Sequence, residues 1–345
     1  MAYTTINKSS LHMNTKLYTG NGSTQSITGV GFQPDWTWIK PRSTTGNHRI
    51  TDAVRGATKQ IYTDLTNAEN TNTNGLTAFG TDGFTVGSDG GYNGNGVTFA
   101  SWNWKANGAG SSNTDGSITS TVSVNTTSGF SIVKWTGNNT GGATVGHGLG
   151  AVPAMIIFRN YSITENWTVY HKGLSSNNHK VDLDGTGAEV TITNPYMENT
   201  TPTSSLITLG DHSRVNGSGN NIIAYCFAEK KGFSKFGSYT GNGSADGTFV
   251  YTGFKPAFVM IKRTGGVQDW IILDNKRPGY NETNRALFPN ANYDDAGTDK
   301  AIDTLSNGFK LRKNHEAINF SENYIYMAFA EAPLVGTNNV PCTAR

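Results

Sequence analysis

The side chains that could bind a metal ion or transfer a proton are scattered along the chain. The seven histidines are His12, His48, His147, His171, His179, His212 and His315. No two of them have the short spacing of a zinc-binding helix or knuckle. We therefore predict ordinary hydrogen-bonding roles for these side chains and expect no metal site.

Two acidic segments are further candidates. Asp182, Asp184 and Glu189 resemble part of a calcium-binding loop, but the segment is too short and lacks the later ligands. Asp294 and Asp295 lie in a polar loop, where solvated charge is the simpler interpretation. Two acids from distant strands can meet in a folded chain without any local signature, so a glycan-degrading activity stays open as an alternative.

Nucleophilic catalysis and nucleotide binding have no supporting motif. A serine hydrolase needs Gly-x-Ser-x-Gly on a strand-to-helix turn, and the segment Val215–Gly219 is a Gly/Ser-rich loop that imitates only part of it. A glycine-rich phosphate loop needs a parallel βαβ unit, which a chain with almost no helical periodicity does not provide. We predict no catalytic residues, no cofactor and no enzymatic activity.

Aromatic side chains in polar loops are the remaining candidates, and they are Tyr92, Tyr196 and Tyr293. A tyrosine ring on a loop can stack on a sugar or anchor a protein interface at a small cost in entropy. The same ring can instead fold back over its own loop, so both interpretations stay open. Five tryptophans lie in or beside apolar segments and are predicted to pack in the core: Trp36, Trp38, Trp135, Trp167 and Trp270.

The elements that must position these side chains occur three times, with a period of about one hundred residues. The opening segments are Tyr18–Ser23, Trp135–Thr140 and Tyr239–Ser244. Proline-containing strands follow at Gly31–Lys40, Gly150–Arg159 and Gly253–Lys262, and then the segments Gly46–Asp52, Glu165–His171 and Gln268–Asp274. A short block comes next, at Gly83–Gly87, Ser205–Gly210 and Gly308–Arg312. Each copy ends with a strand, at Val97–Lys105, Asn221–Glu229 and Tyr324–Glu331.

The apolar segments are short, rich in β-branched and aromatic residues, and separated by Gly/Asn/Asp/Ser clusters. This pattern is typical of strands and turns, so we predict an all-β chain of three tandem antiparallel β-sandwich repeats with jelly-roll-like topology. Alternation along a strand places Trp102 and Trp104 on the face opposite Phe99. The two tryptophans are therefore expected to share one buried surface.

Composition excludes several classes of partner. The chain has 345 residues with 27 basic and 25 acidic side chains, a net charge of +2 and only 15% charged residues. Such a balance favours neither nucleic-acid binding nor attachment to an anionic membrane. No apolar segment reaches the roughly 18 residues of a membrane span, and no signal peptide is expected. Cys226 lies in an apolar run, where a reduced core thiol fits, so we expect synthesis in the cytoplasm.

The matched blocks divide the chain into six parts. We predict an N-terminal docking arm at 1–16, a first sandwich at 17–106, a Gly/Ser/Thr-rich linker at 107–128, a second sandwich at 129–231, a third at 232–333, and a C-terminal tail at 334–345.

The repeated segments resemble an uncharacterised domain family found in virion proteins of marine tailed bacteriophages. The likeness covers nearly the whole chain, and it depends on the opening Tyr-Thr-Gly-Asn-Gly at Tyr18 and Tyr239, Gly-Phe-x-Pro at Gly31 and Gly253, and the segments Val145–Gly150, Ala224–Glu229 and Pro341–Arg345. Proteins of this kind are usually described as structural or tail-fibre-like, and they supply no catalytic residues to carry over.

The resemblance implies a structural virion protein made in the host cytoplasm, acting as a tail fibre or tail appendage in host attachment. A capsid decoration or head-fibre protein is the alternative within the structural class, and a glycan-binding or glycan-degrading surface protein is a further one. The expected partners are other virion proteins and copies of the same chain, with a homotrimer as the expectation because particle positions are symmetric. A host surface glycan or protein is a further candidate partner, whereas nucleic acid and membrane insertion are not expected.

Overall fold

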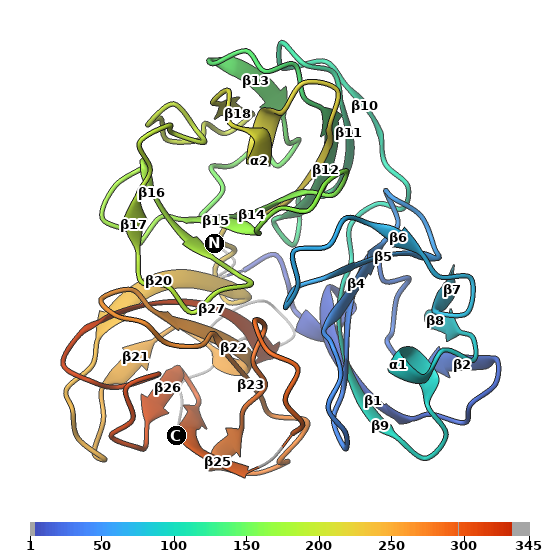
Figure 1. Cartoon of the computed structure of the whole chain (residues 1–345). Helices are drawn as coiled ribbons and strands as arrows, with labels where there is room; N and C mark the ends of the chain where they lie inside the picture. Colours follow the sequence, from blue (N-terminus) through green and yellow to red (C-terminus); the bar gives the residue numbers. More distant parts are fainter. Residues whose placement is uncertain (1–3, 296, 333–345) are drawn as a thin grey trace.

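The computed structural model describes residues 4–295 and 297–332, and its regular secondary structure is almost entirely antiparallel β-sheet. Figure 1 shows three lobes around a common centre, coloured blue to cyan, green to yellow, and orange to red along the chain. We call residues 13–104 lobe 1, residues 111–227 lobe 2 and residues 234–332 lobe 3. The all-β sandwich prediction is confirmed.

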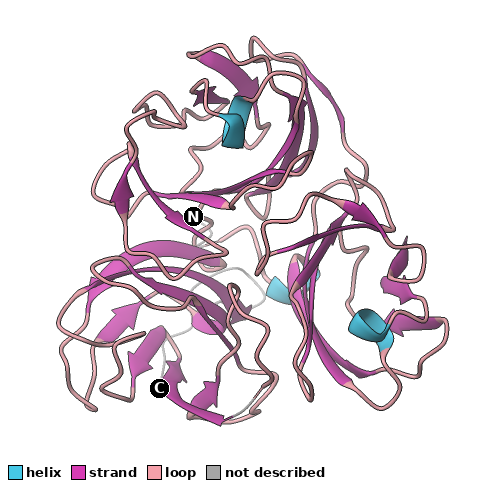
Figure 2. Ribbon diagram, viewed as in Figure 1, coloured by secondary structure: helices cyan, strands magenta, loops and turns pink. Residues whose placement is uncertain are grey.

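Helical segments are few and short (Figure 2). The described residues contain a 3-10 turn, η1 (Ser9–Leu11), and two α-helices of four residues each, α1 (Gly90–Asn93) and α2 (Ser213–Asn216). Within this part of the chain no helix has the length and apolar character to cross a membrane.

Lobe 1 pairs a six-stranded sheet with a three-stranded sheet. The larger sheet has the order β1 (Met13–Thr19), β9 (Thr98–Trp104), β3 (Trp36–Pro41), β4 (Arg49–Asp52), β5 (Lys59–Tyr62), β6 (Asn70–Thr71). The smaller sheet has the order β2 (Gln25–Thr28), β8 (Gly83–Val86), β7 (Leu76–Gly80).

Lobe 2 extends the same plan to an eight-stranded sheet. Its order is β10 (Ser111–Asn113), β11 (Ser120–Asn125), β12 (Phe130–Thr136), β19 (Asn221–Phe227), β14 (Met155–Asn160), β15 (Thr168–His171), β16 (His179–Asp182), β17 (Val190–Thr191). The smaller sheet is the pair β13 (Ala143–Gly146) and β18 (Leu206–Leu209).

Lobe 3 has two four-stranded sheets. One has the order β20 (Ser234–Thr240), β27 (Asn323–Ala332), β22 (Lys255–Arg263), β23 (Ile271–Asp274), and the other β21 (Phe249–Tyr251), β26 (Gly308–Leu311), β25 (Gly297–Leu305), β24 (Thr283–Arg285). The first strand pairs with the last and the second with the last but one. This nested pairing is the jelly-roll-like part of the topology.

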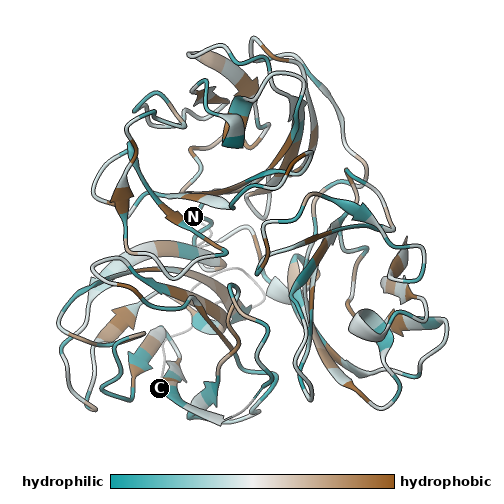
Figure 3. Ribbon diagram, in the orientation of Figure 1, coloured by the Kyte–Doolittle hydropathy of each residue, from teal (hydrophilic) through white to brown (hydrophobic). Residues whose placement is uncertain are grey.

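One sheet of each lobe is buried on both faces: the larger sheet in lobes 1 and 2, and the sheet β20-β27-β22-β23 in lobe 3. One face of this sheet packs against the other sheet of its own lobe and forms a separate core there. The other face contributes to a single central core shared by all three lobes. Along β9, Trp102 and Trp104 point into the central core whereas Phe99 points into the core of lobe 1, which confirms the predicted alternation. Most of the hydrophobic positions accordingly lie on the strands, and the loops are mostly white or teal (Figure 3).

Aromatic side chains dominate the central core. Trp36 stacks on Tyr225 of lobe 2 with ring centroids 4.7 Å apart, and Trp104 meets Phe258 and Phe329 of lobe 3 edge-on at 5.6 Å each. Such aromatic pairs are worth about 0.5–1.5 kcal/mol each beyond the area they bury. The lobes are therefore joined by side-chain packing as well as by the chain.

The opening segment of each lobe is held by a buried asparagine, namely Asn93, Asn216 and Asn319. In each lobe its Oδ1 accepts the backbone N–H of the asparagine in the opening segment, at 2.9–3.1 Å, in the pairs Asn21 with Asn93, Asn138 with Asn216, and Asn242 with Asn319. The aromatic residue of the segment bonds the carbonyl just before that asparagine, in the pairs Tyr18–Tyr92, Trp135–Val215 and Tyr239–Ile318. The repeated opening motif therefore has a structural role.

Two predicted connecting segments take part in the sheets. Residues 107–128, expected to be a linker, contribute β10 and β11 to the edge of the lobe 2 sheet. Short polar side chains are typical of linkers, but they also suit an edge strand, because pairing uses backbone groups. In the predicted docking arm 1–16, residues 13–16 begin β1, and Ile6 is buried in the central core. The predicted tail 334–345 lies outside the described residues.

Candidate functional site

The three lobes are connected in a ring by equivalent backbone hydrogen bonds. In each case the N–H at the start of one matched segment donates to a carbonyl in the loop of another lobe, at 2.8–2.9 Å. The pairs are Gly46 to Asn292, Glu165 to Thr66, and Gln268 to Thr186. Lobe 1 therefore donates to lobe 3, lobe 2 to lobe 1, and lobe 3 to lobe 2. Corresponding positions in the sequence thus make corresponding contacts around a closed cycle.

A fully buried cation strengthens each of these junctions. Lys40, Arg159 and Lys262 end the proline-containing strands, and none is exposed to solvent. Their side chains donate to carbonyls of the same three loops, to Asn292 at 3.4 Å, Thr66 at 2.7 Å and Thr186 at 3.2 Å. Burial lowers the pKa of both lysines to about 8 and that of Arg159 to about 10. Burying these cations is costly, so the carbonyl bonds that offset the cost fix how the lobes meet.

Side chains facing the central core add a third set of bonds between the same three pairs of lobes, with the donor and acceptor lobes exchanged at the junction of lobes 2 and 3. The Tyr225 hydroxyl of lobe 2 donates to Asp52 Oδ2 of lobe 1 at 2.8 Å, and Trp102 Nε1 of lobe 1 donates to Asp274 Oδ2 of lobe 3 at 3.0 Å. In lobe 2 the equivalent position is His171, whose Nε2 donates to the Tyr326 carbonyl of lobe 3 at 3.1 Å. Burial lowers the pKa of His171 to about 4, so the ring is neutral at pH 7.

The two buried aspartates are neutralised within their own lobes. Asp52 pairs with Arg55 at 2.5 Å, and Asp274 pairs with Arg277 at 2.7 Å. Breaking such a buried pair leaves an uncompensated charge and is strongly destabilising. These ionisable groups therefore have a structural role, because their bonds hold the lobes together.

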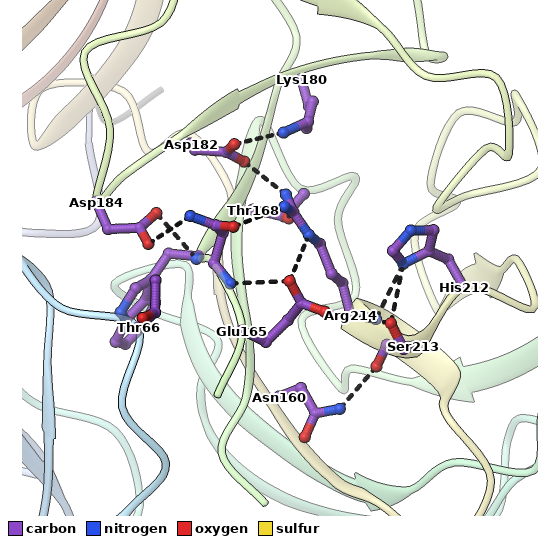
Figure 4. A network of polar contacts seen from close by, with 12 residues as sticks. Thr66, Asn160, Glu165, Thr168, Lys180, Asp182, Asp184, His212, Ser213 and Arg214 are labelled. Atoms are coloured by element: carbon purple, nitrogen blue, oxygen red, sulfur yellow. Dashed lines mark hydrogen bonds and ion pairs between the residues drawn. The ribbon is translucent and has the colours of Figure 1, made fainter. Parts of the chain in front are cut away.

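A polar network on lobe 2, next to its junction with lobe 1, contains several groups that could do acid–base chemistry (Figure 4). The Arg214 guanidinium lies at its centre and donates to Glu165 Oε1 at 3.0 Å, Asp182 Oδ1 at 2.9 Å and Asn166 Oδ1 at 2.9 Å. Lys180 also pairs with Asp182. Each acidic group in contact with Arg214 is thus already paired with a cation.

Ser213 and His212 do not form a nucleophile–base pair. Ser213 Oγ donates to Glu165 Oε2 at 3.2 Å and lies 3.5 Å from His212 Nδ1. That same Nδ1 accepts the backbone N–H of Arg214 at 3.1 Å and so caps α2. The nitrogen that a base would use is therefore occupied by a structural bond.

Asp184 has a raised pKa, to about 6, because it is buried and lies near Asp182. Carboxylates with divergent pKa values are typical of catalytic acid–base pairs. Asp184, however, accepts the backbone N–H of Trp167 at 3.1 Å, just as Asp64 accepts that of His48 at 3.1 Å and Asn290 that of Trp270 at 2.9 Å. The same bond recurs in every lobe, so Asp184 has a structural role that does not require its charge.

The three acidic side chains of the segment that resembles part of a calcium loop also make separate structural bonds. Glu189 Oε1 accepts the backbone N–H of Ser175 at 2.5 Å, while Asp182 and Asp184 hold Arg214 and Trp167. Within the described residues no group of three or more His, Cys, Asp or Glu side chains is placed to hold a metal ion.

The three loop tyrosines predicted from the sequence have different environments. Tyr92 is only 1% exposed and lies in the core of lobe 1, and Tyr196 is 6% exposed in the core of lobe 2. The prediction that these two rings are available for contact is corrected by their burial. Tyr293 is 55% exposed, with Phe288 edge-on at 5.6 Å. The structure therefore does not bring the three together.

Exposed aromatic side chains are instead concentrated in one lobe. Within the described residues all five belong to lobe 3, and they are Phe249, Tyr251, Tyr280, Tyr293 and Phe320. Tyr280 is the most exposed of them, at 85%, and it lines a groove of about 370 Å³. Sequence reasoning missed Tyr280. A detectable signal was the extra length of its loop relative to the matching loops of lobes 1 and 2.

Comparison with known proteins finds one family model that spans all three lobes. A model for a domain of unknown function, DUF7483, matches residues 8–333, a span that includes all three lobes. No curated protein and no solved structure matches the chain. Because the matched span runs from before β1 to the end of β27, the three interlocked lobes together make up the domain, and the chain belongs to the DUF7483 family.

Proposed function

We propose that this chain is a non-catalytic structural protein of a tailed-bacteriophage virion, acting in a tail fibre or tail appendage that takes part in host attachment. The observation that supports it is the closed cycle of interlobe bonds. The buried groups Lys40, Arg159, Lys262, Asp52 and Asp274 all contribute to joining the lobes. A chain that uses its buried polar groups in this way is suited to a rigid architectural role.

The repeated motifs support the virion assignment through their resemblance to proteins of marine tailed phages. The proposed partners are other virion proteins and further copies of the chain, with a homotrimer as the expected assembly. Synthesis would take place in the host cytoplasm and the mature location would be the particle.

Analysis of purified particles tests the proposal. Mass spectrometry of density-purified virions should detect peptides of this chain, and a particle map should contain three-lobed density on the tail. Regular placement over the capsid would instead favour a decoration or head-fibre protein. Absence of the chain from particles of a phage that encodes it would refute the virion role altogether.

A further inference from the structure

Lobe 3 has an open polar groove that takes no part in the hydrogen bonds between the lobes described above. Its cavity volume is about 370 Å³, within the range of roughly 300–1,000 Å³ typical of small-molecule sites. The start of β22 supplies Lys255, the end of β27 supplies Glu331, and the loop between β23 and β24 supplies Tyr280. The groove is therefore built on paired strands, with one long loop as its wall.

That loop is peculiar to lobe 3. Ile50 pairs with Ile61 in lobe 1 and Val169 with Val181 in lobe 2, whereas the equivalent Ile272 pairs with Leu287. The lobe 3 connection is thus four residues longer than that of lobe 1 and three longer than that of lobe 2. Lobes 1 and 2 form the same interlobe contacts with the shorter connection. The additional residues of lobe 3 are therefore not needed to join the lobes.

Two polar atoms in the wall of the groove lack partners. Thr283 is 1% exposed, and its Oγ1 makes no hydrogen bond within the described residues; the same is true of the buried Asn275 Oδ1. A buried polar group without a partner costs about 1–3 kcal/mol. By contrast, Asn281 in the same wall is satisfied, because its side chain bonds the N–H and C=O of Thr304 at 3.0 Å each. Thr283 Oγ1 and Asn275 Oδ1 are therefore unsatisfied polar atoms just beneath the surface of the groove, which gain a partner if their side chains turn toward a ligand.

The charge of the groove favours an anion. Lys255 pairs with Glu331 at 2.7 Å and is neutralised. Lys276 also lines the groove, and within the described part of the chain its ammonium has no ion-pair or hydrogen-bond partner. One positive charge is therefore left unmatched among the lining side chains, beside an exposed tyrosine ring.

We propose that this groove binds an acidic saccharide unit, a pyranose that carries a carboxylate. The Tyr280 ring stacks on the apolar face of the sugar, and the Lys276 ammonium pairs with the carboxylate. The side chains of Thr283 and Asn275 turn into the groove to bond the sugar hydroxyls. The idea deepens the attachment role proposed above by naming the chemical class of the receptor, and it makes lobe 3 the recognition lobe.

The test uses the purified full chain and two matched probes. A galacturonic acid trisaccharide and its methyl-esterified, neutral counterpart are titrated to about 10 mM, because a single sugar subsite gives weak affinity, and binding is followed by saturation-transfer NMR and calorimetry. The acidic trisaccharide should bind more tightly than the neutral one. Tyr280→Ala should weaken binding by about tenfold. Lys276→Gln should equalise the two probes.

Tyr293→Ala is the matched control, since Tyr293 is an exposed tyrosine of the same lobe that does not line the groove. It should leave the dissociation constant unchanged. Equal binding of both probes by the unmodified chain would overturn the role of Lys276. Failure of both probes to bind, or a loss of binding in Tyr293→Ala and not in Tyr280→Ala, would overturn the site. These results are independent of whether the chain is found in particles, so the groove and the virion role fail separately.

Discussion

Removing the Tyr225 hydroxyl should weaken the junction between lobes 1 and 2. Tyr225→Phe keeps the ring that stacks on Trp36 but deletes the donor to Asp52, a carboxylate with no solvent exposure. Arg55 still pairs with Asp52, so the charge stays compensated while one bond is lost. Hydrogen bonds to charged groups contribute about 1.5–3 kcal/mol. We therefore expect the free energy of unfolding to fall by about 2 kcal/mol.

Urea unfolding followed by far-UV circular dichroism and by tryptophan fluorescence measures this change. The midpoint should fall while the slope with urea stays constant, because the exposed surface is the same. The two probes should give one shared transition, since the lobes share a central core. Tyr170→Phe is the control: Tyr170 is buried, and its hydroxyl makes no hydrogen bond within the described residues. We expect that control to change stability by less than about 0.5 kcal/mol.

A double-mutant cycle with Asp52→Asn separates the contact from other effects of the tyrosine substitution. The coupling energy should account for most of the loss. A change below about 0.5 kcal/mol in Tyr225→Phe, or a second transition in the unmodified chain, would contradict the view that this bond joins two lobes into one folding unit.

Three further substitutions test the scaffold. Burial raises the Asp64 pKa to about 6, above its unfolded value of about 3.9. The protonated carboxyl therefore adds about 3 kcal/mol to the free energy of unfolding, which is fully present below pH 4 and lost as pH rises through 6. In urea titrations at different pH values, Asp64→Asn should remove this dependence of stability on pH. Asn216→Ala should cost about 2 kcal/mol in the same assay, because the fully buried amide no longer bonds the backbone N–H of Asn138 and the carbonyl of Thr140. Gly83→Ala should lower the melting temperature by several degrees, because φ is +149° there and an added Cβ would lie 1.9 Å from the Ile27 carbonyl oxygen.

The strands and their faces were predictable because alternation is a local property. Trp102 and Trp104 share a face whatever the rest of the chain does, and the sequence predicted their joint burial. What covers that face was not predictable, because its partners lie in other lobes. The buried Lys40 shows this clearly: its place at a strand end repeats in all three copies, but its partner carbonyl at Asn292 is 252 residues away.

The prediction that Tyr92 and Tyr196 are available for contact was wrong for a different reason. Position in a polar loop does not determine which way a ring points. Tyr92 occupies the place taken by Val215 in lobe 2 and Ile318 in lobe 3, each directly before the buried asparagine. Apolar residues at the two equivalent positions indicate an apolar slot, so a comparison of the copies could have predicted burial.

The junctions of the ring differ in chemistry while keeping the same geometry. Lobes 1 and 3 place an Asp–Arg pair, Asp52–Arg55 and Asp274–Arg277, beneath the donor from another lobe. Lobe 2 has His171 at the equivalent place, with its ring neutral at pH 7. A neutral contact avoids the cost of burying charge, whereas the ionic ones accept only a donor of the right geometry. Two ionic junctions and one neutral junction make the three lobes chemically distinguishable, which favours one order of assembly around the ring over its permutations.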